Sequence, residues 1–326
     1  MGGDFGPRST IPASILSLQK NDDLSIVIFG EQKVISSFLI DVPPELASRI
    51  SIVHCTQIVE MCDRPSYALR HKRDSSMCKA LEYLRDGHVD AFVSAGNTGA
   101  LMGLGCYVLK TSPGIDRPAI CAPIPTPTGQ SYLLDLGANV DTTSDNLHQF
   151  AMMGSVLASA VDGLSCPRVA LLNIGEEKIK GNEQVKVAST LLSDDPEINY
   201  VGYVEGDNLF FGVADVIVCD GFVGNIALKT SEGVVKFISH ISGEIFGDVM
   251  SKVVSRAVRP LFERLYKKID PRSRNGAYFL GLQGVVIKSH GNADLEAFSQ
   301  AVDRAAECVE KDMITLLDKQ LELLAH

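Results

Sequence analysis

The chain has 326 residues, of which 45% are hydrophobic and 21% charged, which is enough to build a large core in a single α/β unit. Its formal net charge of −10 argues against general affinity for nucleic acid, so we expect no nucleic-acid partner. The N-terminus lacks the basic-then-apolar pattern of a signal peptide, and no uninterrupted apolar stretch is long enough to span a bilayer.

Hydrophobic patterning predicts an alternation of strands and helices along the chain. Strands are expected at 24–29, 50–54, 89–94, 119–124, 131–135, 168–173, 198–204, 214–219 and 285–288. Helices are expected at 31–40, 75–86, 98–109, 144–161 (capped by Ser144), 182–192 and 294–324, the last in one or two pieces. A further long helical region is expected to open at Asn225 and to break near Pro260.

Five of the predicted strands run directly into loops that are rich in Gly, Asn and Asp. Continuous apolar runs are typical of parallel strands buried on both faces, and crossover helices bring the carboxyl ends of such strands to one edge of a sheet. We therefore expect the five loops to meet at one edge, where glycines and helix N-termini favour an anion. The loops are 96–99, 135–139, 173–177, 220–225 and 289–292.

This order of elements predicts a three-layer α/β/α, Rossmann-like fold in which residues 1–326 form a single α/β catalytic domain. An amphipathic helical arm is expected at 232–275, where apolar pairs recur about every four residues with basic residues between them. Such an arm could dock against a second subunit, lie in a membrane interface or bind an acidic carrier protein. The residues expected to make these contacts are Lys252, Arg256, Arg259, Leu261, Phe262, Arg264, Lys267 and Lys268.

Several classes of site are disfavoured by missing motifs. The sequence has no G-x-S-x-G elbow, no P-loop, no correctly spaced dinucleotide glycines and no metal-binding pattern, so we expect neither a cofactor nor a metal. What remains is an anion pocket of loop amides with groups such as Lys180, Asn225 and Asn97. Bound phosphate is itself a nucleophile, so such a pocket could serve acyl transfer, although a sugar-phosphate or nucleotide site would look the same.

The strand-end motifs resemble the PlsX phosphate acyltransferase family of bacterial phospholipid synthesis. The matching segments are 94–102, 134–141, 172–177 with Lys180-Gly181, 219–225, 1–7, 74–77 and 287–291. The resemblance implies a fold similar to that of the phosphotransacetylases and the isocitrate dehydrogenase group. It also implies transfer of a fatty acyl group from an acyl carrier protein thioester to inorganic phosphate, which gives acyl-phosphate for phosphatidic acid synthesis.

The resemblance further implies a homodimer that is cytoplasmic and peripherally associated with the membrane, where the downstream glycerol-phosphate acyltransferase resides. It assigns catalytic roles to Lys180, as charge compensation for phosphate and oxyanion, and to Asn225, as a donor to carbonyl or phosphate. The implied substrate-binding residues are Gly96, Asn97, Thr98, Gly99, Asp135, Asn139, Asp220, Lys288 and His290. Hydrogen bonding within the loops is an equally good interpretation of the Asp and Asn side chains.

The sequence departs from this family at one point. Members normally carry a strand before the Met-Gly-Gly-Asp motif, whereas this sequence starts at that Met: either the start is misassigned or the strand is missing, and a missing strand would leave a neighbouring strand with an open edge. Two other functions stay open: a short-chain phosphotransacetylase that acts on acyl-CoA, and a non-catalytic scaffold at the membrane.

Overall fold

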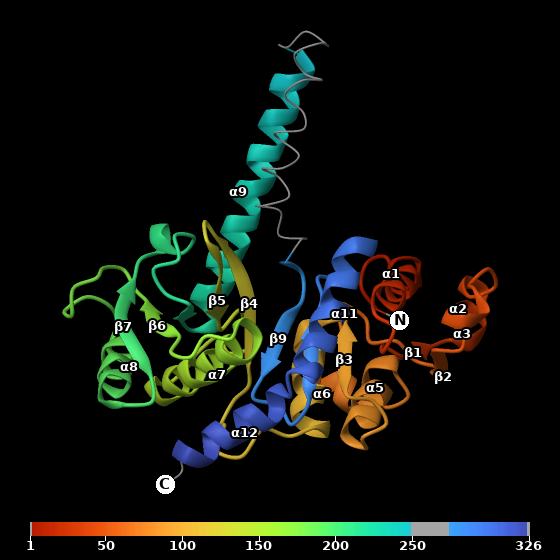
Figure 1. Cartoon of the computed structure of the whole chain (residues 1–326), viewed down its shortest axis with the longest axis horizontal. Helices are drawn as coiled ribbons and strands as arrows, with labels where there is room; N and C mark the ends of the chain where they lie inside the picture. Colours follow the sequence, from red (N-terminus) through yellow and green to blue (C-terminus); the bar gives the residue numbers. More distant parts are fainter. Residues whose placement is uncertain (1, 249–273, 325–326) are drawn as a thin grey trace.

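The computed structural model describes residues 2–248 and 274–324, and it places a central sheet between layers of helices (Figure 1). The strands are β1 (Ile26–Gly30), β2 (Ile50–His54), β3 (Ala91–Ser94), β4 (Ala119–Thr126), β5 (Gly129–Leu134), β6 (Arg168–Leu172), β7 (Asn199–Val204), β8 (Val216–Val218), β9 (Ala277–Leu280) and β10 (Val285–Lys288). The helices are α1 (Pro7–Lys20), α2 (Gln32–Phe38), α3 (Pro44–Ala47), α4 (Pro65–His71), α5 (Ser76–Arg85), α6 (Thr98–Val108), α7 (Ser144–Asp162), α8 (Glu183–Asp194), α9 (Gly221–Asp248), α11 (Leu295–Glu310) and α12 (Met313–Leu324), with a 3₁₀ turn η1 at Gly206–Asn208.

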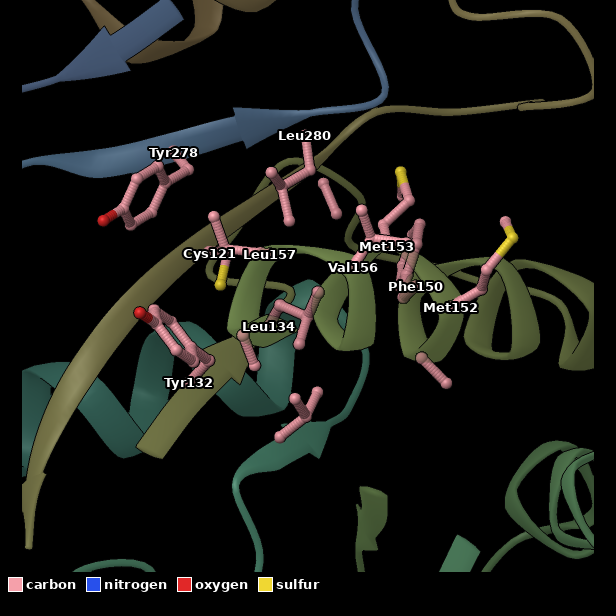
Figure 2. Packing of buried hydrophobic residues seen from close by; sticks show 14 of the residues in the cluster. Cys121, Tyr132, Leu134, Phe150, Met152, Met153, Val156, Leu157, Tyr278 and Leu280 are labelled. Carbon is pink, nitrogen blue, oxygen red and sulfur yellow. The ribbon is translucent and has the colours of Figure 1, made fainter. Parts of the chain in front are cut away.

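The expected α/β/α layering is confirmed by the way side chains alternate along the middle strands. On β4, Cys121 packs into one buried cluster, whereas its neighbour Ile120 packs into the cluster on the other face. Helices α7, α11 and α12 cover the first face, and α4, α5, α6 and the start of α9 cover the second. Figure 2 shows the first face, with α7 and the rings of Tyr132 and Tyr278, which meet edge to face at 6.3 Å.

All nine expected strands are present, and the differences lie mainly in helices. Helix α1 was not predicted. Its buried face mixes Ile11 and Leu18 with small polar residues: Ser9 donates to the carbonyl of Ala293, and the Ser17 hydroxyl lies 2.9 Å from the Ser299 hydroxyl. Strand β9 and the short helices α3 and α4 were also missed. The N-cap of α7 is Thr143 and not Ser144, as its hydroxyl accepts from the N–H of Asn146.

The expectation that five strand ends share one edge of a parallel sheet is wrong. The larger sheet has the order β3-β10-β9-β4-β5-β8-β6-β7, and the three pairs between β10 and β5 are all antiparallel. Three reversals make β3 and β10 run opposite to β5, β8 and β6. The carboxyl ends of the two groups therefore point in opposite directions, which apolar runs alone do not reveal.

The register nevertheless brings the two groups of strand ends to one level. Ile287 of β10 pairs with Tyr278, Tyr278 pairs with Cys121, and Cys121 pairs with Leu134, the last residue of β5. Both groups thus end halfway along the sheet and point toward one another across β9 and β4. This stagger, rather than a shared edge, creates the space in which a ligand can meet loops from both groups.

A second open space separates the two sheets. Strand β1 pairs with β2 in a small sheet, and β3 forms the edge of the large one. A cavity of about 560 Å³ lies between them, and every residue from Leu24 to Phe29 and from His88 to Gly96 lines it. Within residues 2–248 and 274–324, no strand pairs with β1 or β3 across this gap, which Gly2 also lines.

Helix α9 extends well away from the body of the molecule (Figure 1). It accounts for the first part of the arm expected at 232–275. The basic and apolar contact residues predicted between Lys252 and Lys268 lie outside the described residues.

Candidate functional site

A cavity of about 800 Å³ lies between α9 and the face of β4 and β5. Most of its wall is apolar, whereas cationic side chains line one end. The apolar wall is formed by Ile120, Ala122, Pro123, Ile124, Pro125, Pro127, Leu133, Leu136, Leu209, Phe210, Leu228, Val234, Val235 and Ile238. The polar end is formed by Thr98, Asn225, Lys229, Glu232, Arg274, Lys288, Ser289 and His290. A long apolar groove that leads to a cationic end suits a ligand with an aliphatic chain and an anionic group.

Two glycines allow the start of α9 to reach this cavity. The backbone of Gly224 lies so close to the next loop that an added Cβ would be 1.9 Å from the carbonyl oxygen of Asp135. At Gly221, an added Cβ would be 2.5 Å from the carbonyl oxygen of Asn139. Asp220 caps the helix by accepting from the N–H of Val223 at 2.8 Å. The helix therefore begins at Gly221, four residues earlier than predicted, and Asn225 lies in its second turn beside Gly137.

The Asp135 carboxylate organises the loop on which α9 rests. It is fully buried and accepts hydrogen bonds from the N–H groups of Ile120, Ala138 and Asn139, and from Nδ2 of Asn139. The Asn139 amide also donates to the carbonyl of Pro118 at 2.8 Å. Burial raises the pKa of Asp135, while these donors favour its charged form. These contacts give Asp135 and Asn139 a structural role in shaping the cavity wall.

The polar end of the cavity combines lysines, a histidine and one carboxylate. Glu232 lies between two partners: its Oε2 is 3.0 Å from Nζ of Lys229, and its Oε1 is 3.7 Å from Nε2 of His290. Lys288 is 9% exposed, and its ammonium donates to the carbonyl of Ser289. Burial, followed by the charge of Lys229, lowers the pKa of Lys288 to about 8, against a smaller opposing effect of Asp4.

Further positive charge comes from Arg274, whose Nη1 donates to Oε1 of Gln130 at 3.4 Å. Burial lowers the pKa of Arg274, but guanidinium groups stay charged in proteins. Among the charged groups that the structure describes in the cavity lining, Lys229, Lys288 and Arg274 are cationic and Glu232 is the single carboxylate. This end has the charge required to bind an anion such as phosphate.

Four of the residues singled out from the sequence line this cavity: Thr98, Asn225, Lys288 and His290. Thr98 begins α6 after β3, and Asn225 belongs to α9 after β8. Thr98 and Asn225 therefore follow strands that run in opposite directions. In a parallel sheet their loops would meet at one edge, whereas here the stagger of the strand ends brings both loops to one cavity. Asp220 acts on the cavity indirectly, as the cap of α9.

The 96–99 turn is mostly structural. The Asn97 side chain accepts from the N–H of Ala100 and donates to the carbonyls of Glu60, Met61 and Asp63, at 2.9–3.1 Å for the three carbonyls. These contacts cap α6 and fix the 60–63 loop, which leaves the Asn97 amide little capacity for a ligand. Gly96 faces the cavity between β1 and β3, and Gly99 is exposed beside Pro65.

Lys180 is the other residue to which the family resemblance assigned catalysis. It belongs to the loop after β6, its side chain is exposed, and it does not line the 800 Å³ cavity. The amide of Asn173 organises this loop by donating to the carbonyls of Gly175 and Lys180, at 3.0 and 3.3 Å. The structure therefore places Asn225 in the lining of this cavity and Lys180 outside it, on loops that follow the neighbouring parallel strands β8 and β6.

Lys229 and Glu232 were not predicted as site residues. They follow Asn225 by four and seven positions, which places all three on one face of α9. That helical spacing was a usable signal once Asn225 had been selected. The apolar wall of β4 carried a weaker signal, since Pro123, Pro125 and Pro127 resemble an ordinary turn.

The described part of the chain has neither a membrane-spanning helix nor a group of metal-binding side chains. No helix in residues 2–248 and 274–324 is long and apolar enough to cross a bilayer. Within the same ranges, no three His, Cys, Asp or Glu side chains are grouped so that they could hold a metal ion.

Sequence comparison identifies close relatives. The family described as "Fatty acid synthesis protein" matches residues 1–316. A protein of Halorhodospira halophila named phosphate acyltransferase is 51% identical over 325 residues, which cover 99% of this chain and 95% of the relative. A Pseudomonas putida protein of the same name is 52% identical over 323 residues, with 99% and 96% coverage.

Solved structures support the fold. The EutD phosphotransacetylase from Staphylococcus aureus superposes with a TM-score of 0.60 at 16% identity, covering 92% of this chain and 90% of that one. A branched-chain phosphotransacylase from Enterococcus faecalis gives 0.55 at 15% identity, with 94% and 96% coverage. Together with the sequence matches, this confirms the resemblance drawn from the strand-end motifs. The chain belongs to the fatty acid synthesis protein family, to which its relatives named phosphate acyltransferase are similar over nearly their whole length.

Proposed function

We propose that this protein is an enzyme that transfers a fatty acyl group from an acyl carrier protein thioester to inorganic phosphate. The observation that carries the proposal is the 800 Å³ cavity, in which a long apolar wall leads to a cluster of cations. The names of the curated relatives support acyl transfer to phosphate. The carrier protein as donor and acyl-phosphate as a precursor of phospholipid are the finer parts of the proposal.

Phosphate binds at the cationic end in this scheme. Lys229 and Lys288 hold its oxygens, with help from Arg274 and from the N-terminus of α6 at Thr98. A bound phosphate oxygen then attacks the thioester carbonyl, and no enzyme group needs to become acylated. Because the cations lie in a partly enclosed site, they stabilise the added negative charge more strongly than they would in water.

The acyl chain lies along the apolar wall. Ile120, Ala122 and Ile124 of β4 face the cavity on one side, and Leu228 and Val235 of α9 face it on the other. Burying each methylene of a fatty chain contributes about 0.8 kcal/mol, so this wall favours long chains over acetyl groups. That preference separates the proposed activity from a short-chain phosphotransacetylase.

Asn225 and Lys180 remain the proposed catalytic groups. Asn225 lines the cavity, where its amide can donate to the carbonyl oxygen during attack. Lys180 is exposed on the loop after β6, the strand beside β8, and its proposed role is to neutralise charge as phosphate attacks. The proposal needs no metal and no cofactor.

The partners are proposed from the surface of α9. Phe222, Ile226, Phe237 and Ile241 are exposed on this protruding helix, and a group of exposed large apolar side chains often marks an interaction surface. We propose that the helical arm joins two subunits in a homodimer and presents its basic segment to carrier protein or lipid. Peripheral contact with the membrane would deliver acyl-phosphate to a membrane glycerol-phosphate acyltransferase, and it fits a cytoplasmic location.

The test supplies purified protein with phosphate and with one of two donors, palmitoyl-carrier protein or acetyl-CoA, and measures free thiol. Phosphate-dependent release from the long-chain carrier thioester supports the proposal. Faster release from acetyl-CoA would support a short-chain phosphotransacetylase instead. Vesicle binding without release from either donor would support a non-catalytic scaffold.

A further inference from the structure

His290 and Glu232 form a pair at the cationic end of the cavity. The Nε2 atom of His290 lies 3.7 Å from Oε1 of Glu232, and both residues line the cavity. This separation is slightly longer than a hydrogen bond, as is common for catalytic groups before substrate binds. The Glu232 side chain is only 12% exposed, whereas that of His290 is 39% exposed and accessible from the cavity.

The backbone under His290 is held firmly. Its N–H donates to Oδ1 of Asn275 at 3.0 Å. The Asn275 amide is itself buried and donates to the Ser289 hydroxyl and to the carbonyl of Ala297, both at 2.7 Å. His290 therefore belongs to a strand-end loop that these hydrogen bonds fix in place, and its imidazole faces α9.

The surrounding charges favour a neutral imidazole. Burial lowers the pKa of His290, and the charges of Lys229, Lys288 and Lys236 lower it further, while Glu232 raises it. Asp4 acts on the neighbouring Lys288 from the N-terminal loop. A histidine whose pKa lies below 6.5 is mostly unprotonated at pH 7, so it can accept a proton.

The proposed reaction must move one proton. Hydrogen phosphate attacks the thioester carbon, a C–O bond forms and the C–S bond breaks. The products are acyl-phosphate dianion and the carrier thiol, so the proton of hydrogen phosphate ends on sulfur and total charge is conserved. Some group has to take this proton from the phosphate oxygen and return it to the departing thiolate.

We propose that His290 carries this proton and that Glu232 is its positioning residue, an inference that rests on the proposed function. In the attack, the neutral imidazole accepts the proton from the phosphate oxygen. The imidazolium, stabilised by the Glu232 carboxylate, then donates the proton to the sulfur as the C–S bond breaks. Lys229, 3.0 Å from Glu232, holds that carboxylate in place and offers its remaining donors to phosphate.

The test compares the pH dependence of kcat/KM for wild type, Glu232→Gln, Glu232→Asp and His290→Ala. A matched control is Glu244→Gln, which removes the carboxylate of another Glu–His pair on α9, 3.3 Å from His240 and outside the cavity lining. Thermal melting checks that each variant is folded, and calorimetry measures its affinity for inorganic phosphate.

We expect His290→Ala to lower kcat about 100-fold, within the range typical of general acid–base catalysis, and added imidazole to restore part of it. Glu232→Gln should move the acidic limb of the profile to lower pH, because the pKa of His290 falls when the carboxylate charge is lost. Glu232→Asp should restore the profile in part, and Glu244→Gln should match wild type.

Two failures are distinguishable. If folded wild type releases no thiol in response to phosphate, the proposed function is overturned, and the proton relay with it. If wild type is active but Glu232→Gln leaves the profile unmoved, or His290→Ala keeps full kcat, the relay alone is overturned. A titration of the His290 ring by NMR in wild type and Glu232→Gln provides a readout that does not depend on turnover, and an unchanged pKa would also contradict the pairing.

Discussion

Ile287 of β10 and Leu134 of β5 lie at the same level of the sheet, although their strands run in opposite directions. Only β9 and β4 separate them, so the strand ends face each other across roughly three strand spacings, or about 14 Å. Loops from both halves of the sheet therefore border one cavity, which α9 covers. This relationship places Asn225 and His290 around one space, and the following predictions depend on it.

Gly224→Ala should destabilise the protein, because its Cβ would lie 1.9 Å from the carbonyl oxygen of Asp135 and α9 would have to move. The expected loss is about 3 kcal/mol or more in the free energy of unfolding, the upper range for overpacking. Urea titration followed by circular dichroism measures it.

Gly233→Ala on the same helix is the matched control. Nothing lies within 4 Å of its added Cβ, so better helix propensity should stabilise the protein by about 0.5–1 kcal/mol. Equal effects of the two substitutions would show that α9 does not approach the 135–137 loop this closely.

Phosphate affinity should fall as pH rises above about 8. Burial and the nearby charge of Lys229 lower the pKa of Lys288 to about 8, so its ammonium is charged below that pH and lost above it. Phosphate binding itself favours the charged lysine, so the decline begins at or slightly above this value. Calorimetric titration with inorganic phosphate from pH 7 to 9.5 measures the change.

Lys288→Met should weaken phosphate binding at pH 7 by about tenfold or more, as expected for loss of a charged hydrogen bond, and should remove the decline. Lys186→Met is the control, because Lys186 is paired with Glu183 on the outer helix α8. An affinity that stays constant up to pH 9.5 in wild type would argue against Lys288 as a phosphate ligand.

Ala122→Phe should change selectivity for chain length. Ala122 lies between Ile120 and Ile124 on the cavity wall, and a phenyl ring there occupies space assigned to the acyl chain. Turnover of palmitoyl-carrier protein should drop about tenfold or more, since several methylenes lose their burial, while butyryl-carrier protein is little affected. Val201→Phe, at an exposed site on β7, is the control. An equal loss of turnover for both acyl-chain lengths would show that the acyl chain binds elsewhere.

A strand added in the gap between β1 and β3 is expected to stabilise the protein. A five-residue apolar strand, fused ahead of Met1, would enter the 560 Å³ cavity that Gly2 already lines and would pair with both sheet edges. The melting temperature should rise by several degrees relative to a Gly/Ser extension of equal length. If the two extensions give the same melting temperature, the gap does not accept a strand.

Much of the fold follows from local patterns in the sequence. The apolar runs predict the nine strands, and Asn182 and Asn97 were placed correctly at the starts of α8 and α6. Strand direction does not follow, because a buried apolar run such as Ala119–Ile124 reads the same in a parallel and an antiparallel sheet. Helix α1 escaped prediction because three serines interrupt the apolar residues Ile11, Ala13 and Leu18 on the buried face that packs against α11.

The candidate site was only partly predictable for a related reason. The sequence identified His290 and Lys288 together at a strand end. It gave no reason to select Glu232, which becomes a candidate only because α9 lies across the sheet and places its carboxylate 3.7 Å from His290. Conversely, Asn97 and Asp135 have the residue types of ligand groups, yet their hydrogen bonds go to the protein's own loops. Sequence motifs thus identify important residues at a strand end, but they do not distinguish residues that bind a ligand from residues that stabilise the loop.

The most direct test of the central claim follows both the acyl group and the phosphate. Protein is mixed with carrier protein bearing a radiolabelled palmitoyl group, with and without inorganic phosphate, and the label is traced by hydroxylamine trapping and by denaturing electrophoresis. Direct attack by phosphate predicts that trapped acyl-phosphate equals the thiol released, that both require phosphate, and that no label stays covalently on the protein. Label bound to a Cys or Ser of the protein during turnover, or release without phosphate, would contradict the account.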